Sequence, residues 1–452
     1  MSPTPAPSRS TSPFAPFRHK VFAAFWTGAF LSNIGTWMET VGVGIYVTAK
    51  TDNSGWTGLV AAAGFVPGAI LGPVGGALAD RLPRKALLLT TTSIQTLLAT
   101  LLAFLAATGH PSPGLVTLIV LGEGCAQAIG FPTYQSVLPD LVPPEDLVGA
   151  VALSSAQWNL GRVLGPAAAG AVIALGGYAW AFAVNAASFF ALIAALLLLH
   201  LPRPQYDGST IRRAIGQGVG YVRRDPGLRV VMGYMFVNTF LAAPFIALVP
   251  AMGQIVLHEG TFGTTVLIIA QGFGAVLMGL ALGPLTQRFG SRRVLLAVLW
   301  SLPVALVAYA AMPTLALAAI AIFFVGMIYL GALSSFMSIA QIRAPAAIRG
   351  RVVSLLAVVL GVLYPLGAIL QGAIGHQVGL RETTAAAAVL MLLALFVMRL
   401  RNPRFADALD EPPVPIEASD VADARRDGCE DVDTDRLGLA PDEIPIPSAD
   451  PS

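Results

Sequence analysis

Residues 76–85 read GALADRLPRK, and residues 283–293 read GPLTQRFGSRR. Each stretch joins the end of a long apolar segment to a short basic turn, after which the next apolar segment begins. The two copies lie in opposite halves of the 452-residue chain. This recurrence predicts two similar halves, each made of the same series of apolar segments.

Outward from these turns, apolar segments continue along nearly the whole chain. Hydrophobic residues make up 55% and charged residues 12% of the chain, whereas a typical soluble protein carries about 25% charged residues. A membrane-spanning helix needs about 20 mostly apolar residues, and helices or closed barrels satisfy the backbone in lipid. We therefore predict an all-α polytopic membrane protein, with spans near 21–49, 57–79, 86–108, 114–138, 148–175, 178–200, 229–256, 262–286, 293–311, 314–340, 352–375 and 382–399.

These spans predict twelve transmembrane helices in two pseudo-symmetric six-helix bundles. The longest polar break between them contains prolines and a basic amphipathic stretch, which is typical of a connector between two bundles. The expected parts are a disordered N-terminus (1–16), an N-terminal bundle (17–200), a cytoplasmic connector (201–228), a C-terminal bundle (229–404) and a disordered acidic cytoplasmic tail (405–452).

The positions of Lys and Arg predict the orientation of the chain. Nearly all of those that flank the spans fall in loops on one side, and only Lys50 and Arg381 fall on the other. Because Lys and Arg concentrate in cytoplasmic loops, we expect a multi-pass protein of the plasma (inner) membrane with both termini cytoplasmic. The tail, with 14 acidic residues and three arginines, is expected to remain in solution there.

Three ionisable residues, Glu39, Glu123 and Arg162, lie well inside predicted spans. Such residues are costly in a membrane and usually functional, so we expect a site for proton coupling or for a charged substrate. A static ion pair that ties helices together is the alternative interpretation.

Polar side chains share helical faces with these three charges or lie in the spans of the second half. They form the candidate substrate cavity, although each alone is also explained by helix packing. The set is Ser32, Thr36, Gln127, Tyr134, Asn159, Asn238, Tyr329, Ser338 and Tyr364.

The stretch 76–85 also carries a family resemblance. Gly76, Asp80, Arg81, Arg84 and Lys85 resemble the signature between helices two and three of the major facilitator superfamily. The resemblance covers residues 17–404 and implies a conformational latch at these five residues, with Asp80 against the start of a neighbouring helix near Arg351 when the cytoplasmic side is closed.

A narrower resemblance links the chain to the branch that includes siderophore and drug exporters. It is carried by GTWM at 35–38 and by the spacing of Asn159, Arg162, Gly165 and Pro166. The small residues Gly161, Gly165 and Gly170 around Pro166 resemble the export motif of the fifth helix, and simple helix packing explains them equally well.

These observations predict a secondary active exporter of a small amphipathic molecule, such as a siderophore, a drug or a secondary metabolite. Proton antiport with alternating access is the expected energy source, because the chain has no nucleotide-binding motif. A proton-coupled nutrient importer with the same fold and a non-transporting receptor or scaffold are the alternatives. We expect no enzyme, catalytic residue, cofactor, metal or nucleic acid; the expected partners are the substrate, protons and the lipid bilayer, and the expected state is a monomer.

Overall fold

The computed structural model describes residues 14–109, 111–199, 201, 211–345, 348–402 and 405–414. Within these ranges each of the twelve predicted spans is helical, and no strand occurs. Eleven spans are long and apolar enough to cross a membrane. The remaining one, α1 (Lys20–Thr51), is 32 residues long and is made less apolar by polar side chains such as Asn33 and Glu39.

The chain separates into two compact units. The first unit comprises Met1–Thr51 and Ile70–Pro204, and the second comprises Asp52–Ala69 and Gln205–Ser452. The second span is therefore shared between the units, whereas the sequence analysis assigned all of it to the first half. The early part of this span belongs with the second unit because Ser54 donates a hydrogen bond to the carbonyl of Gly372 at 2.8 Å, and Phe65 packs edge-on against Tyr364.

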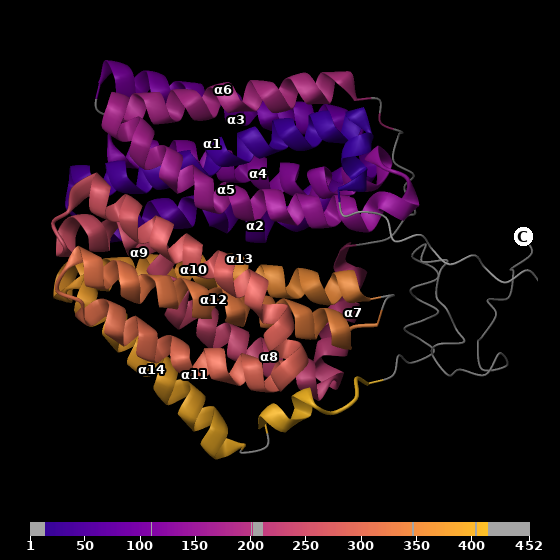
Figure 1. The fold of residues 1–452 in the computed structure, drawn as a ribbon. Coiled ribbons are helices and arrows are strands. Elements are labelled where there is room, and N and C mark those ends of the chain that lie inside the picture. The colour runs from indigo at the N-terminus through magenta and orange to yellow at the C-terminus, as the bar shows by residue number, and fades with distance from the viewer. Residues whose placement is uncertain are drawn as a thin grey trace, which may run out of the picture. The chain divides into compact units, whose positions relative to one another are not determined.

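In the first unit, α1 packs along α5 and α6, and α3 packs against α4 and α6 (Figure 1). Its further helices are the later part of α2 (Ser54–Arg81), α3 (Arg84–Thr108), α4 (Pro113–Leu141), η2 (Pro144–Asp146), α5 (Leu147–Gly176) and α6 (Tyr178–Leu198). A short turn, η1 (Ala15–Arg18), precedes α1.

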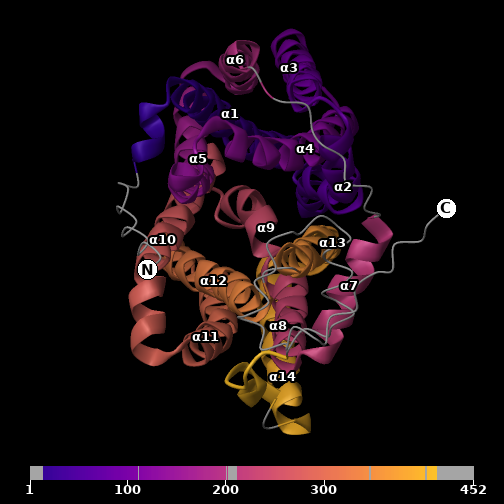
Figure 2. The ribbon, with the colours of Figure 1, turned by 90° about the vertical axis from the view of Figure 1, so that its right-hand side faces the viewer.

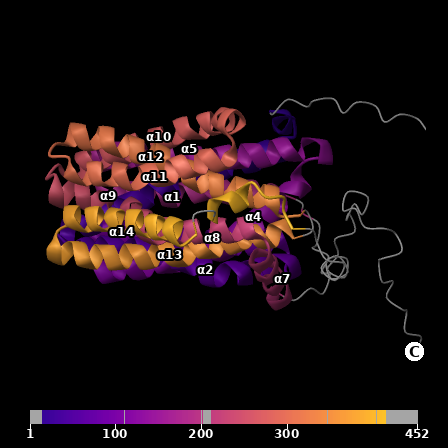
Figure 3. The same ribbon diagram turned by 90° about the horizontal axis from the view of Figure 1, so that it is seen from below.

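In the second unit, α12 lies between α10 and α11, as the end-on view in Figure 2 shows. The helices α13 and α14 run side by side (Figure 3). The elements are α7 (Ile211–Arg224), α8 (Pro226–Val237), η3 (Asn238–Ala242), α9 (Phe245–Ala251), η4 (Met252–Val256), α10 (Gly260–Phe289), α11 (Ser291–Ala311), α12 (Leu315–Arg343), α13 (Arg349–Val378), α14 (Leu380–Arg401) and η5 (Phe405–Leu409).

The same pairings and turns recur in both units. The contacts of α3 with α4 and α6 are matched by those of α11 with α12 and α14. A single glycine connects α5 to α6 and α13 to α14: Gly177 has φ +80° and Gly379 has φ +105°. Because a side chain disfavours positive φ, glycine at these tight turns is a backbone requirement. The predicted two-fold repeat is thereby confirmed.

The seventh span is interrupted by two π-helical turns, η3 and η4. In η3 the amide of Gln371 on α13 donates hydrogen bonds to the carbonyls of Phe240 and Leu241, at 3.3 and 3.0 Å. A carbonyl left unbonded in lipid is costly, so this side chain stabilises the irregular turn from a neighbouring helix. Single π-turns inside helices occur frequently at functional sites.

The start of the acidic tail differs from the expectation of disorder. Residues Phe405–Leu409 form the helical turn η5, and the Phe405 ring packs edge-on against Tyr234 at 5.7 Å. Asp407 and Asp410 both pair with Arg292 at the start of α11. Specific pairing and ring burial offset the entropy of ordering this segment. The rest of the tail, 415–452, and residues 1–13 lie outside the described residues.

Candidate functional site

Two glutamates of the first unit lie close together. Glu39 on α1 is 4% exposed, and its carboxyl group is near that of the half-buried Glu123 on α4. The amide of Asn185 on α6 donates a hydrogen bond of 2.8 Å to Glu39 Oε2. An ionised carboxylate has only acceptors, so two neighbouring carboxyl groups can share a hydrogen bond when one of them carries a proton.

One oxygen of this pair lacks a partner within the protein. Glu123 Oε1 is buried and accepts no hydrogen bond from the described residues. A buried polar atom without a partner is destabilising, and such atoms are rare in native proteins. Glu123 therefore keeps an acceptor that the described side chains do not use.

Arg162, the third ionisable residue predicted inside the spans, contacts an aromatic ring. Its guanidinium lies over the ring of Trp37, 5.5 Å from the ring centroid. The carboxyl group of Glu39 instead lies near that of Glu123 and accepts a hydrogen bond from Asn185. The structure thus brings together two of the three predicted charges and puts the third against an aromatic ring.

The glycines around Pro166 set the spacing of α5 against α1. A Cβ atom at Gly165 would lie 2.4 Å from Trp37 Cβ and 2.9 Å from the Ile34 carbonyl oxygen. Gly161 lies equally close to the Asn33 side chain. Larger residues at either position would force the helices apart, so the packing interpretation of this motif is supported.

Polar side chains of the first unit form a network beside α1. Tyr134 on α4 donates a hydrogen bond of 2.9 Å to Gln157 Oε1, and the Asn33 amide donates to the Gln157 carbonyl at 3.1 Å. On α3, Gln95 donates to Gln127 Oε1 at 2.9 Å. Two further predicted cavity residues, Ser32 and Thr36, lie on α1, where the Thr36 hydroxyl donates to the Ser32 carbonyl. Asn159 lies on α5, and its side chain is outside the described part.

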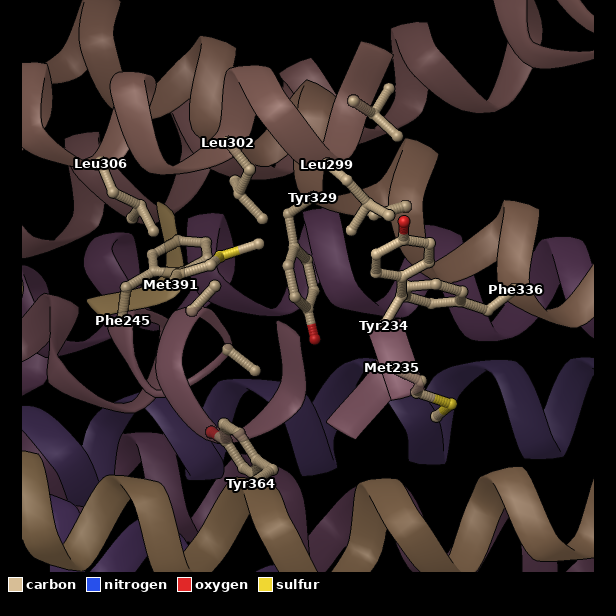
Figure 4. Packing of buried hydrophobic residues seen from close by; sticks show 14 of the residues in the cluster. Tyr234, Met235, Phe245, Leu299, Leu302, Leu306, Tyr329, Phe336, Tyr364 and Met391 are labelled. Carbon is tan, nitrogen blue, oxygen red and sulfur yellow. The ribbon is translucent and has the colours of Figure 1, made fainter. Parts of the chain in front are cut away.

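Most of the predicted cavity residues of the second unit lie in its hydrophobic core. Figure 4 shows Tyr329 and Tyr364 among the large apolar side chains of this core. Tyr329 packs edge-on against Phe245 at 5.6 Å. Asn238, in the π-turn, is 1% exposed, and neither of its amide atoms has a partner among the described residues. Ser338, by contrast, is exposed.

The basic turn after α2 ties helices of the first unit together. Arg84 bonds Asp140 Oδ2 at 2.7 Å and the Ser136 carbonyl at 3.1 Å, near the end of α4. Lys85 Nζ donates to the carbonyls of Leu197 and Leu199, at 2.8 and 2.7 Å. A cation at the C-terminal end of a helix is favourable because the last carbonyls have no intrahelical partner.

The other latch residues are exposed on this turn. Asp80 and Arg81 both have side chains at the surface of the end of α2. Gly76 has no heavy atom within 4 Å of the position of a Cβ. The contact of Asp80 with a helix near Arg351 stays a prediction.

One partner of the site was missed by the sequence analysis. Asn185 is the one amide side chain in the very apolar sequence of α6, and this rarity is a signal that points to it. Among the described residues no group of three His, Cys, Asp or Glu side chains is placed to hold a metal ion.

Comparison with known proteins assigns the chain to a family. The family model described as transmembrane secretion effector matches residues 11–425. The Enterobactin exporter EntS of Escherichia coli (strain K12) is 27% identical over 425 residues, which cover 89% of this chain and 96% of that protein. The Staphyloferrin A transporter of Staphylococcus aureus (strain NCTC 8325 / PS 47) is 29% identical over 177 residues, which cover 39% of this chain and 45% of that protein.

Solved transporter structures share the fold. A bacterial homolog of the human lysosomal transporter Spinster matches with a TM-score of 0.69 at 16% identity, covering 87% of this chain and 98% of that one. A D-xylose-proton symporter matches with a TM-score of 0.63 at 12% identity, covering 84% and 97%. The predicted all-α transporter fold is confirmed by these likenesses. The chain belongs to the transmembrane secretion effector family of the major facilitator superfamily, and it is a multi-pass membrane transporter rather than an enzyme.

Proposed function

We propose that the protein is a secondary active exporter of a siderophore-like small molecule, driven by proton antiport. Export is supported by the secretion family and by the match to an enterobactin exporter over 96% of that protein's length. Coupling to protons is supported by one observation above all, the proximity of the carboxyl groups of Glu39 and Glu123 inside the first unit.

The proposed cycle uses the carboxyl pair as a proton carrier. With a proton between them, the two groups stay in contact, and Asn185 satisfies an oxygen of Glu39. When the proton leaves, two carboxylates in a site of low polarity repel each other, so α1 and α4 are driven toward a different arrangement. Proton loss and gain are in this way linked to the helix movements that carry the substrate across.

The proposal also covers the membrane location, the topology and the oligomeric state of the protein. The basic loops support placement in the inner membrane with both termini cytoplasmic, by the positive-inside rule. We further propose that a monomer is sufficient, because the carboxyl pair lies within a single unit of one chain.

The test is transport into inside-out vesicles, with and without an imposed proton gradient. The substrates would be enterobactin, staphyloferrin A and ethidium, and the variants Glu39→Gln and Glu123→Gln. We expect gradient-driven accumulation to be lower in each variant than in the wild type by a factor of about ten or more, because a neutral amide cannot exchange a proton. Exchange of substrate across the membrane without a gradient should continue.

Glu259→Gln is the matched control, since Glu259 is an exposed glutamate just before α10. It should accumulate substrate like the wild type. Undiminished gradient-driven accumulation in the Glu39→Gln, Glu123→Gln double variant would refute the coupling role. Accumulation that appears only in right-side-out vesicles would favour the importer.

A further inference from the structure

An aromatic cluster of the first unit lies where α1, α4 and α5 come together. The rings of Trp37 and Trp158 meet edge-on with centroids 5.8 Å apart, and those of Trp158 and Phe131 lie 5.5 Å apart. The guanidinium of Arg162 lies on Trp37, 5.5 Å from its ring centroid. Three helices therefore contribute three rings and one cation to a single cluster, here called the aryl platform.

The helical positions of these residues indicate that the platform does not face lipid. Phe131 is four positions after Gln127 and eight after Glu123, so it shares the polar face of α4. Trp158 is four positions before Arg162 and shares the polar face of α5. A lipid-facing ring would instead share its helix face with aliphatic residues.

The platform is also not a closed packing core. Trp158 is 38% exposed and Phe131 is 42% exposed, whereas core aromatic residues of this unit such as Phe25 are fully buried. Beside the rings, the indole N–H of Trp37 and the side-chain oxygen of Asn33 are buried without hydrogen-bond partners among the described residues. A buried donor and a buried acceptor next to exposed ring faces are the combination of polar and apolar groups that a ligand site uses.

The chemistry of the platform selects one kind of ligand. Ring faces attract another flat ring by stacking, and the guanidinium attracts negative charge. We propose that Trp37, Phe131, Trp158 and Arg162 form a subsite for an aromatic ring that bears an acidic group, such as a catechol or an arene carboxylate. The proposal rests on the proposed export function and deepens it, because it names the chemical class of the exported molecule.

The platform extends away from the carboxyl pair along α4. Trp37 is two positions before Glu39 on α1, whereas Phe131 is eight positions after Glu123 on α4, a rise of about 12 Å at 1.5 Å per residue. Phe131 is thus the platform residue assigned to substrate recognition at a different depth from the carboxyl pair. Variants of Phe131 should change substrate binding and leave the gradient dependence of transport intact.

The test compares an aromatic with a non-aromatic siderophore on the purified full-length protein in lipid nanodiscs. The probes are enterobactin, which carries catechol rings, and staphyloferrin A, which is built from citrate and has no aromatic ring. Calorimetry would give the Kd of each probe for the wild type, Trp158→Leu and Trp158→Phe. We expect Trp158→Leu to weaken enterobactin at least tenfold and staphyloferrin A less than twofold, and Trp158→Phe to stay within about threefold of the wild type.

Two controls separate recognition from folding. Phe104→Leu changes an aromatic residue of α3 that is 61% exposed and outside the platform, so both Kd values should be unchanged. If Trp158→Leu does not fold, Phe131→Leu gives the same comparison with an expected loss of several fold.

An equal loss of affinity for both probes would show that the platform has only a structural role, and it would overturn the proposal. Unchanged affinity for both probes would also overturn it. Gradient-driven transport of staphyloferrin A by a wild type that does not bind enterobactin would overturn the subsite and leave export standing. Absence of gradient-driven transport for both probes would overturn the proposed function itself.

Discussion

The two units carry a hydrogen-bonded pair of a basic and an acidic residue at the same place in the repeat, and the two pairs differ greatly. In the first unit, His19 before α1 meets Asp146 after α4 at 2.9 Å, with the histidine side chain 37% exposed. In the second, Asp225 before α8 meets Arg343 at the end of α12 at 2.8 Å, with exposures of 0% and 5%. The acidic and basic partners have exchanged positions between the units, and only the second pair is buried.

The buried pair is the centre of a larger network. Asp225 also caps α8 by accepting from the Leu228 N–H at 2.7 Å. Arg343 donates to the carbonyl of Glu411 at 2.8 Å, and the Val414 N–H donates to Asp225 at 3.2 Å. The start of the acidic tail is thereby held in the second unit, and nothing equivalent is described in the first.

The repeated basic turn shows the same difference. Arg84 of the first copy pairs with Asp140 on α4, inside its own bundle. Arg292 of the second copy pairs with Asp407 and Asp410 of the tail segment. The motif thus stabilises the end of a helix in the first unit. In the second unit it stabilises the start of the tail, residues 405–414, here called the strap. Equivalent positions in the two units should therefore contribute unequally to the stability of the protein. Three variants measure this difference, from the largest expected loss of stability to the smallest.

The largest effect is expected from Arg343→Met. Removing the cation leaves the fully buried Asp225 without its partner, which costs about 3–5 kcal/mol when a buried pair is broken. Reversible unfolding of the purified protein by SDS would measure the loss. The Asp225→Asn, Arg343→Met double variant should recover part of it, because no uncompensated charge remains. A single variant as stable as the wild type would show that the buried pair is not the centre of this network.

A smaller effect is expected from shortening the tail. A chain ending at Asn402 loses the partners of Arg343, Arg292 and Tyr221, and should be less stable by about 1–3 kcal/mol, the typical cost of leaving buried polar groups unsatisfied. A chain ending at Val414 keeps every one of these contacts and is the matched control. Equal unfolding midpoints for the two truncations would show that the strap does not stabilise the second unit.

The smallest effect is expected from His19→Ala. A partly exposed pair is screened by solvent, so its loss should change stability by about 0–1 kcal/mol. The same SDS unfolding measurement gives the direct comparison with Arg343→Met. A loss from His19→Ala that equals the loss from Arg343→Met would remove the asymmetry between the two units.

The sequence predicts which residues belong to the candidate site but not which of them lie in contact. Glu39, Glu123 and Arg162 stand out because charge is rare in an apolar span. That Glu39 meets Glu123 while Arg162 lies on Trp37 depends on how α1, α4 and α5 are rotated about their axes. Asn185 became part of the site only because α6 packs against α1.

The sequence by itself determined the number and limits of the spans, the two-fold repeat and the polar face of each helix, because apolar length and helical period are local properties. The tertiary structure decided which polar faces meet, which of two equivalent pairs is buried, and that the tail begins with an ordered strap. Those contacts join residues far apart in the chain, such as Asp225 and Val414. They follow from the packing of whole helices, which no local pattern encodes.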